Sequence, residues 1–151
     1  MKTYVLMLAK VFPKGHPKAG QPTGFKEKFL KGEKIHTIRH NAGLWSKRIK
    51  EVALGYAKLS IRQWSGLPYR SKQEILKELT YKDDVGCEGI NLVMFNTDKY
   101  TDLMPITAKN DGLSLQDWKD WFKYDLSAST DRKLLIIIHF TNFRYIEKYG
   151  R

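Results

Sequence analysis

The segment KLLIIIHFTNF, residues 133–143, constrains the fold more than any other part of the chain. It contains five successive leucines and isoleucines with polar residues on either side. A continuous apolar run rich in β-branched residues is typical of a strand that is buried on both faces. We therefore predict a buried strand over 133–143, which requires other elements of the chain to cover it.

The other expected elements are separated by Gly- and Pro-rich stretches. Thr23 can cap a short helix over 24–32, and Ser114 with Asp117 forms a capping pattern before a helix over 114–122. Ser71 with Glu74 forms a similar pattern that predicts a third helix over 72–80. The remaining expectations are a strand over 3–11, a loop over 13–24, a helical turn over 44–50, one or two strands within 51–64, a loop over 64–71 and a strand over 86–96.

Strands outnumber helices in this pattern, and no regular βαβ alternation is present. The expected fold class is therefore α+β, in the form of a small β-barrel with a few short covering helices. The length of 151 residues fits one domain over 1–151. Cys87 is the only cysteine, which excludes an intrachain disulfide and favours a reducing, cytoplasmic location. The apolar stretch at the amino terminus is too short for a secretory signal, and no run of 18 apolar residues predicts a membrane span.

Positive charge is concentrated in the first half of the chain. Residues 1–72 contain 16 lysines and arginines and 3 acidic residues, a net charge of +13, whereas residues 73–151 contain 11 and 13, a net charge of −2. Lysines and arginines that neutralise phosphates release counterions, so such asymmetry favours a nucleic-acid partner. A solvated surface without a partner is the simpler explanation of the same charge.

The ten residues GEKIHTIRHN, 32–41, hold two histidines among several cations. His36 and His40 have the spacing of a helical zinc pair, but the glutamate that would act as general base is missing. Lys34 and Arg39 would also repel a dication, so we expect no metal site here. His139, in the apolar strand, is expected to be a core or rim residue.

Lys34, Thr37 and Arg39 are the candidates for chemistry in this segment. On an ideal strand Lys34 and Thr37 would point to opposite faces, so they converge only if the chain turns. Gly32, directly after the predicted helix, makes such a turn possible. A half-buried strand with one solvated face is the alternative.

The run G-E-K-I-H-T-I-R resembles the signature of the ASCH family, a branch of the PUA-like superfamily. The matching residues are Gly32, Lys34, Thr37 and Arg39, and the later segment DGLSLQDWKDWF is similar to a second element of that family. The resemblance implies a PUA-like β-barrel with a cleft for RNA or a nucleotide. Small bacterial members hydrolyse the acyl group of N4-acetylcytidine with a lysine, a threonine and a glutamate. These residues match Lys34 and Thr37, and the glutamate falls at Asp111, which is one methylene shorter.

Two functions from different classes are therefore predicted for the same cleft. In the first, the cleft binds RNA or a modified nucleotide, with Lys34 and Arg39 near phosphates and aromatic residues stacked on bases. Its further candidate residues are Trp45, Arg62, Trp64, Tyr69 and Arg70, with Lys31, Lys47 and Arg48 as additional phosphate contacts. In the alternative, the protein is a nucleoside amidohydrolase.

For amide hydrolysis, Thr37 would be the nucleophile, a neutral Lys34 its base and Asp111 the proton shuttle to the leaving amine. No cofactor is expected in either reading. Trp118 and Trp121 are assigned to the core, and the loop over 13–24 is expected to be able to close over the cleft. A protein that only mediates protein contacts would leave the one-sided charge unused.

Overall fold

The computed structural model describes residues 1–96, 100–127 and 134–150, and it is a mixed α+β structure with two small sheets. The strands are β1 (Lys2–Met7), β2 (His36–Arg39), β3 (Ala57–Trp64), β4 (Gln73–Leu79), β5 (Gly86–Ile90) and β6 (Leu135–His139). The six α-helices are α1 (Phe25–Leu30), α2 (Ala42–Ala53), α3 (Met104–Asn110), α4 (Leu115–Trp121), α5 (Lys123–Ser127) and α6 (Tyr145–Tyr149). Three 3₁₀ helices are η1 (Tyr81–Asp83), η2 (Leu92–Asn96) and η3 (Thr101–Leu103).

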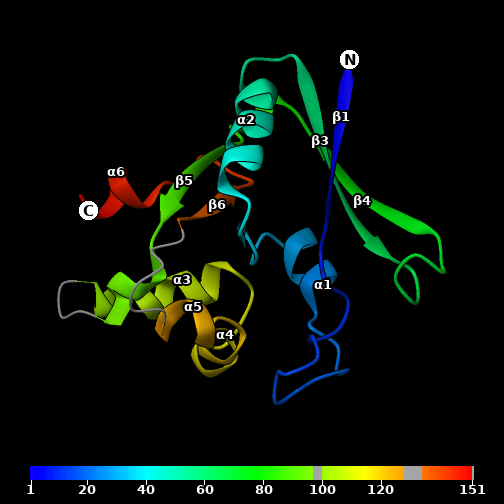
Figure 1. Cartoon of the computed structure of the whole chain (residues 1–151). Coiled ribbons are helices and arrows are strands. Elements are labelled where there is room, and N and C mark those ends of the chain that lie inside the picture. The colour runs from blue at the N-terminus through cyan, green and yellow to red at the C-terminus, as the bar shows by residue number, and fades with distance from the viewer. Residues whose placement is uncertain (97–99, 128–133, 151) are drawn as a thin grey trace.

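The strands pair as two separate sheets of three (Figure 1). In the first, β1 runs parallel to β3, which pairs antiparallel with β4. In the second, β6 lies between β2 and β5 and is antiparallel to both. No closed barrel is found among residues 1–96, 100–127 and 134–150. The α+β class is therefore confirmed, with the strands of the described residues paired as two small sheets.

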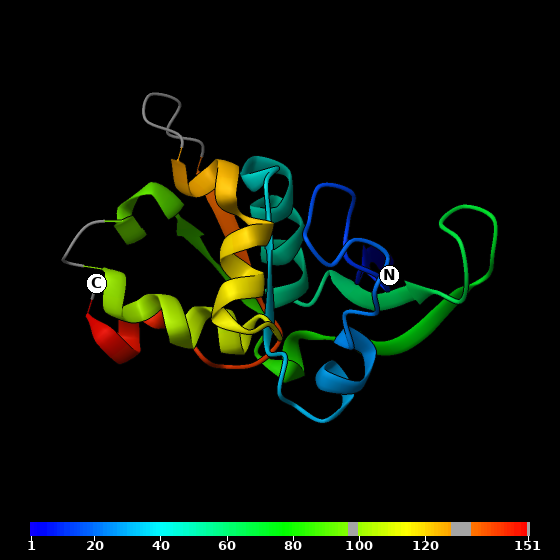
Figure 2. The same ribbon diagram turned by 90° about the horizontal axis from the view of Figure 1, so that it is seen from below.

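Helices cover the two sheets unequally (Figures 1 and 2). The four helices α3 to α6 gather around the sheet of β2, β6 and β5, whereas α1 and the β3–β4 hairpin lie on the other side of the molecule. Helix α2 contacts β3, β5 and β6 and so packs against both sheets. Segments that are distant in the sequence therefore lie close together between the two sheets.

The buried strand predicted over 133–143 is confirmed at β6. All five of its residues are buried, which is what its apolar sequence requires. Lys133, the first residue of the predicted strand, lies outside the described residues. The helices predicted near Thr23 and from Ser114 are also confirmed as α1 and α4, and the Ser114 hydroxyl accepts a hydrogen bond from the Asp117 amide as a helix cap.

The helix predicted over 72–80 is wrong, because this segment forms β4. Ser71 does not cap a helix; its hydroxyl accepts a hydrogen bond from the Gly66 amide and donates one to the Leu67 carbonyl, which closes the hairpin loop. The backbone groups of β4 instead pair with β3. Tertiary pairing thus overrides a local helix signal.

The predicted boundary between helix and strand in residues 44–64 is also wrong. Helix α2 continues to Ala53, so its last residues are not a strand, and β3 begins only at Ala57. The Asn41 side chain caps this helix at its first turn, and Ile49 and Val52 are buried on its inner face. In the segment predicted as a strand over 86–96, only Gly86–Ile90 is a strand, and Leu92–Asn96 is a 3₁₀ helix.

Candidate functional site

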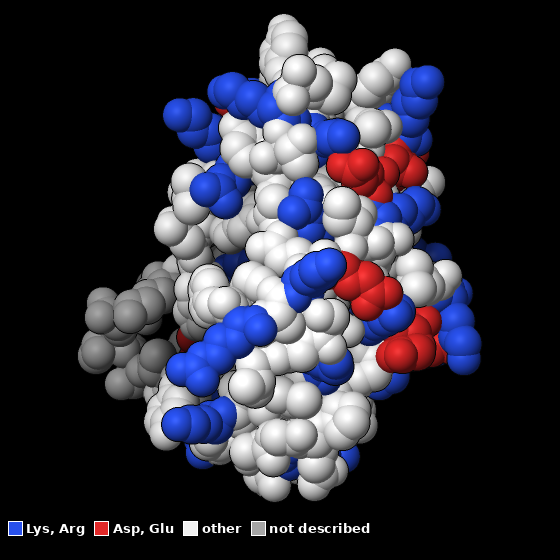
Figure 3. Space-filling view, turned by 90° about the vertical axis from the view of Figure 1, so that its right-hand side faces the viewer, with Lys and Arg blue, Asp and Glu red and all other residues white. Residues whose placement is uncertain are grey.

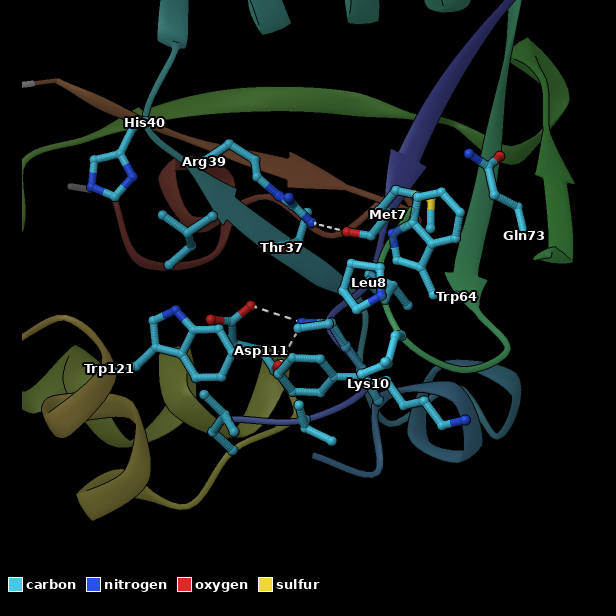
Figure 4. A pocket seen from close by; sticks show the side chains of 18 of the residues that line it. Met7, Leu8, Lys10, Thr37, Arg39, His40, Trp64, Gln73, Asp111 and Trp121 are labelled. Carbon is cyan, nitrogen blue, oxygen red and sulfur yellow. Dashed lines mark hydrogen bonds and ion pairs between the residues drawn. The ribbon is translucent and has the colours of Figure 1, made fainter. Parts of the chain in front are cut away.

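A cavity of about 920 Å³ lies between the two sheets. Its walls come from the end of β1, from β2, from the β3–β4 hairpin, and from the region around α3 and α4 (Figure 4). Residues that carry polar groups or aromatic rings into it include Lys10, Phe25, Lys34, Thr37, Arg39, His40, Trp64, Tyr69, Gln73, Asp111, Trp121 and Phe122. The cavity therefore combines a polar wall with an aromatic one.

Lys34 is buried at the polar wall, with only 2 % of its surface exposed. Its amide donates to the Lys28 carbonyl, and the next amide, of Ile35, donates to the Asn110 carbonyl. This irregular segment after α1 directs Lys34 into the cavity that Thr37 also lines, which the alternation of a regular strand would prevent. The turn that the sequence required is thus present.

The Lys34 ammonium group is held mainly by one residue, Asp111 (Figure 4). Its Nζ donates to the Asp111 carbonyl oxygen at 2.6 Å and to the Asp111 carboxylate oxygen Oδ1 at 3.1 Å. It also lies 4.1 Å from the centroid of the Phe25 ring, a cation–π contact. The cation is therefore well partnered although almost no water reaches it.

Asp111 follows the last residue of α3, and the position after it must be glycine. Gly112 has a φ of +84°, and a Cβ atom there would lie 3.2 Å from the Cβ and Cδ atoms of Lys34. A side chain at this position would both strain the backbone and push on Lys34. The glycine allows the carboxylate and the lysine stem to approach each other.

Burial changes the proton affinity of both partners. Burial lowers the pKa of the Lys34 ammonium group, although the charge of Asp111 opposes this effect. Burial also acts to raise the pKa of Asp111, but Lys34 and His36 outweigh it, so the pKa of this carboxyl lies below its ordinary value. Asp111 consequently loses its proton more easily than an ordinary aspartic acid, and Lys34 more easily than a surface lysine.

Thr37 and Arg39 lie two residues apart on β2 and both line the cavity. Thr37 is buried, with 7 % of its surface exposed. One Arg39 nitrogen donates to the Met7 carbonyl at 2.6 Å, and its buried Nε has no partner among the described residues. Burial lowers the pKa of Arg39, but a guanidinium remains charged at any physiological pH.

The charge of Arg39 is not neutralised by an ion pair within the described residues. Lys34 and Asp111 compensate each other, so Arg39 leaves the polar wall with an excess positive charge. A mostly buried cation with free N–H donors is costly unless an acceptor binds there. The cavity is therefore electrostatically suited to an anionic or strongly polar ligand group.

The aromatic wall comes from two elements on opposite sides of the cavity (Figure 4). Trp64 ends β3, and its ring centroid lies 5.2 Å from that of Tyr69 in the hairpin loop. Tyr69 has a φ of +63°, a left-handed conformation rare for a bulky residue. Trp121, the last residue of α4, and Phe122, which follows it, line the cavity.

Several predicted binding residues lie away from this cavity. Trp45 is on α2, where the Arg48 guanidinium lies 5.0 Å from its ring centroid. Arg62 donates to Ser60 and Gln73, and Arg70 is exposed on the hairpin loop. None of these three residues lines the cavity. Lysines and arginines are instead spread widely over the face of the molecule shown in Figure 3.

Two residues at the site were assigned other roles by the sequence. Trp121 was expected in the core with Trp118; Trp118 is fully buried, but Trp121 is only partly buried and lines the cavity. His36 was set aside with the histidine pair, yet its Nδ1 lies 3.5 Å from the Asp111 carboxylate. A helical apolar stripe does not distinguish a core tryptophan from a cavity one, and the contact between His36 and Asp111 is not encoded locally.

The histidines of the 32–41 segment have different partners. His36 is fully buried against Tyr145, whereas His40 is exposed and contacts Asp125 at 2.9 Å. His139 is buried and bonded to Glu88, in agreement with its expected core position.

Among the described residues, one group with possible metal-ligand spacing is His16, Asp117 and Asp120. Both His16 ring nitrogens are engaged, one by the Lys18 amide and one by the Asp117 carbonyl. The Lys18 ammonium group also pairs with the Asp117 carboxylate at 2.8 Å. These contacts fasten the loop over 13–24 to α4 instead of placing it over the cavity.

Comparison with known protein families, with curated proteins and with solved structures finds no match to this chain. In the part of the chain that the structure describes, every helix is too short or too polar to cross a membrane. The site is a partly open cavity with a buried ion pair, a threonine hydroxyl, an unneutralised guanidinium and several aromatic rings.

Proposed function

We propose that the cavity binds a nucleotide or a modified nucleoside, either free or as an unpaired base of RNA. The observation that carries this proposal is the unneutralised Arg39 beside the buried Lys34–Asp111 pair in a cavity walled by aromatic rings. A volume of about 920 Å³ falls in the range of pockets for small organic ligands. A nucleotide has the three features that such a cavity selects, namely a flat base, hydrogen-bonding edges and an anionic group.

Each part of the ligand has a suitable partner. The rings of Trp64 and Trp121 can stack on a base, an interaction that works with any base. The Arg39 guanidinium, which lines the cavity, can bind phosphate oxygens through charged hydrogen bonds. The Asp111 carboxylate and the Thr37 hydroxyl can bond to the edge of the base.

We further propose that the fold is a PUA-like, ASCH-type fold. The resemblance of residues 32–39 to the ASCH signature supports this, because three of its matching residues, Lys34, Thr37 and Arg39, line one cavity. The late segment that resembles the second ASCH element supplies Asp111 and Trp121 to the same place. The two small sheets would then correspond to the halves of the expected barrel.

Binding of cytidine 5′-monophosphate and of cytidine, measured by isothermal titration calorimetry, tests this proposal. Arg39→Ala is expected to weaken binding of the monophosphate by roughly 10- to 100-fold, because charged hydrogen bonds are lost. Binding of cytidine should be weakened much less. Arg48→Ala, which removes an arginine outside the cavity, is the control and should bind both as the parent does. Equal losses for both ligands, or no binding of either at millimolar concentration, would contradict the proposal.

The charge of the first half of the chain suggests a separate test for RNA. If phosphates are contacted, the logarithm of the binding constant for a short single-stranded RNA should fall linearly with the logarithm of the salt concentration. Absence of RNA binding at low salt, together with binding of the monophosphate, would restrict the ligand to a free nucleotide.

A second candidate function is hydrolysis of an N4-acylated cytidine, favoured by Thr37 and the buried Lys34, which line the same cavity. Lys34 in its neutral form would accept the Thr37 proton while the hydroxyl oxygen bonds to the acyl carbon. The proton would then pass to the N4 amine through Asp111 as the C–N bond breaks, and water would hydrolyse the acyl-threonine. Asp111 here replaces the glutamate that the ASCH resemblance implies.

Incubation of the protein with N4-acetylcytidine, followed by chromatography, tests the second candidate. Thr37→Val keeps the shape of the side chain but removes the hydroxyl, and should abolish turnover, whereas Thr37→Ser should retain part of it. Turnover by Thr37→Val at the parent rate would remove Thr37 from the reaction. A parent protein that binds the nucleotide but releases no cytidine would leave only the binding function.

A further inference from the structure

A row of buried polar side chains leads from Asp111 away from the cavity. His36 is fully buried, with its Nδ1 at 3.5 Å from Asp111 Oδ1 and its Nε2 at 2.7 Å from the Tyr145 hydroxyl. The Asn110 amide donates to the same hydroxyl at 3.1 Å. The Asp111 oxygen that faces His36 is also the one that accepts from Lys34.

The hydrogen bonds of Tyr145 favour one position for the His36 proton. The Tyr145 oxygen accepts from Asn110, so its own hydrogen is available to His36 Nε2. With Nε2 as an acceptor, the proton of a neutral imidazole must be on Nδ1, which faces Asp111. The separation of 3.5 Å is longer than an ordinary hydrogen bond, and Nδ1 has no hydrogen-bond partner among the described residues, so it acts on the Asp111 carboxylate mainly as a nearby dipole.

Tyr145 is itself held firmly in place. The Glu88 carboxylate accepts hydrogen bonds from the Tyr145 amide at 2.7 Å and from the Ile146 amide at 3.0 Å. This anchors the start of α6 to β5. The backbone at Tyr145 is therefore held by the fold, and the phenol hydroxyl is contacted by Asn110 and His36.

Three titratable groups from three elements face His36. They are Asp111 after α3, Tyr145 on α6 and His139 on β6, whose ring centroid is 5.5 Å from that of His36. His139 is bonded to Glu88 at 2.7 Å. Among these groups, Asp111 is the one in direct contact with Lys34.

We propose that His36, oriented by Tyr145, is a positioning residue that holds the Asp111 carboxylate ionised and turned toward Lys34. This proposal concerns the charge of Lys34 in the ligand-free protein. It rests on the proposed function of the cavity only for the role that this charge would have. Without the Nδ1 donor, the carboxylate is less firmly held and less strongly stabilised as an anion. It then attracts the Lys34 ammonium group less, and burial shifts Lys34 further toward its neutral form.

Two substitutions of His36 separate the roles of its nitrogens. The amide of asparagine can take the place of Nδ1, whereas the amide of glutamine lies nearer to Nε2 and leaves Asp111 without the donor. Lysine side chains labelled with ¹³C report titration by NMR in the ligand-free protein, and the Lys34 signal is the one lost in Lys34→Met. In His36→Gln, the titration midpoint of Lys34 should fall by about one pH unit, a tenfold change in the ratio of ammonium to amine. In His36→Asn it should stay close to the parent value.

Tyr145→Phe is the milder variant, because it removes only the hydroxyl that orients His36. It should move the Lys34 midpoint in the same direction but less. Tyr149→Phe is the matched control, since Tyr149 stacks on Tyr145 from the same helix and does not bond to His36. An unchanged Lys34 midpoint in a folded His36→Gln protein would overturn the proposal. If His36→Gln does not fold, a Lys34 midpoint in Tyr145→Phe equal to that in Tyr149→Phe would overturn the proposal. Neither result depends on whether the nucleotide binds.

Discussion

The polar wall and the aromatic wall of the cavity are organised in opposite ways. At the polar wall, Lys34 and Asp111 are buried and locked by short contacts, so their geometry exists before any ligand arrives. At the aromatic wall, Tyr69 is 90 % exposed and held in a left-handed conformation. Groups that are ordered in advance cost less to engage on binding. We therefore expect changes in the Lys34–Asp111 pair to lower stability, and changes at the aromatic wall to lower affinity without lowering stability.

The largest effect is expected when the ion pair of the polar wall is broken. Asp111→Ala leaves Lys34 buried without its counter-ion, which typically costs about 3–5 kcal/mol of unfolding free energy. Urea denaturation measures this loss. Glu74→Ala removes the partner of Lys26 in an exposed pair and should cost at most about 1 kcal/mol. Similar small losses in both variants would mean that the buried pair has no special energetic role.

The close approach of Asp111 and Lys34 gives the next effect. Gly112→Ala should destabilise the protein by roughly 2 kcal/mol, through the backbone strain of a positive φ and contact with the Lys34 stem. Gly20→Ala is a matched control, because Gly20 has a φ of +82° and open space where its Cβ would lie. Urea denaturation of both should show a larger loss at Gly112. Equal losses would indicate that only strain matters and that contact with Lys34 does not.

Tyr69→Gly separates affinity from stability at the aromatic wall. Glycine relieves the left-handed strain, so stability should rise by up to about 1 kcal/mol. Loss of a stacking ring should weaken nucleotide binding by about 1 kcal/mol or more, roughly fivefold. Asp84→Gly, at the other described residue with a left-handed non-glycine backbone, should gain stability without losing affinity. Unchanged affinity in Tyr69→Gly would exclude this ring from the ligand site.

The pH dependence of stability gives the smallest effect. The pKa of Asp111 is lowered in the folded protein, so its stabilising contribution is present above its unfolded value, about 4, and is lost as pH falls through the folded value. The stability difference between the parent and Asp111→Asn should therefore shrink on acidification. Urea denaturation at a series of pH values below 6 measures it. A difference that grows toward low pH would contradict the direction of the shift.

The parts of the fold that the sequence predicts are those with strong local signals. The apolar run of β6 and the Ser114 cap of α4 need no knowledge of distant residues. The β4 segment was misassigned because its capping pattern is local, whereas its pairing with β3 is not. The predicted helical turn over 44–50 is shorter than helix α2, because the alternation of apolar and polar residues in the following strand extends back into the last turn of the helix.

The same distinction applies to the candidate site. Thr37 and Arg39 share one face of a strand by simple alternation, and the turn before them brings in Lys34. The contact of His36 with Tyr145 joins residues 109 positions apart, and no local pattern signals it. Trp121 has the spacing of a core residue, and only the packing of α4 next to Asp111 places it at the cavity.

NMR titration with cytidine 5′-monophosphate tests the central claim most directly. If the cavity between the sheets binds the nucleotide, the largest shifts should occur at the methyl groups of Leu8, Ile38 and Leu113, which line it. The methyl groups of Ile90 and Leu103, which line a separate cavity of about 230 Å³, should not move. Arg39→Ala should abolish the shifts at the same ligand concentration. Shifts confined to surface lysine-rich segments, or centred on Ile90 and Leu103, would show that the site lies elsewhere.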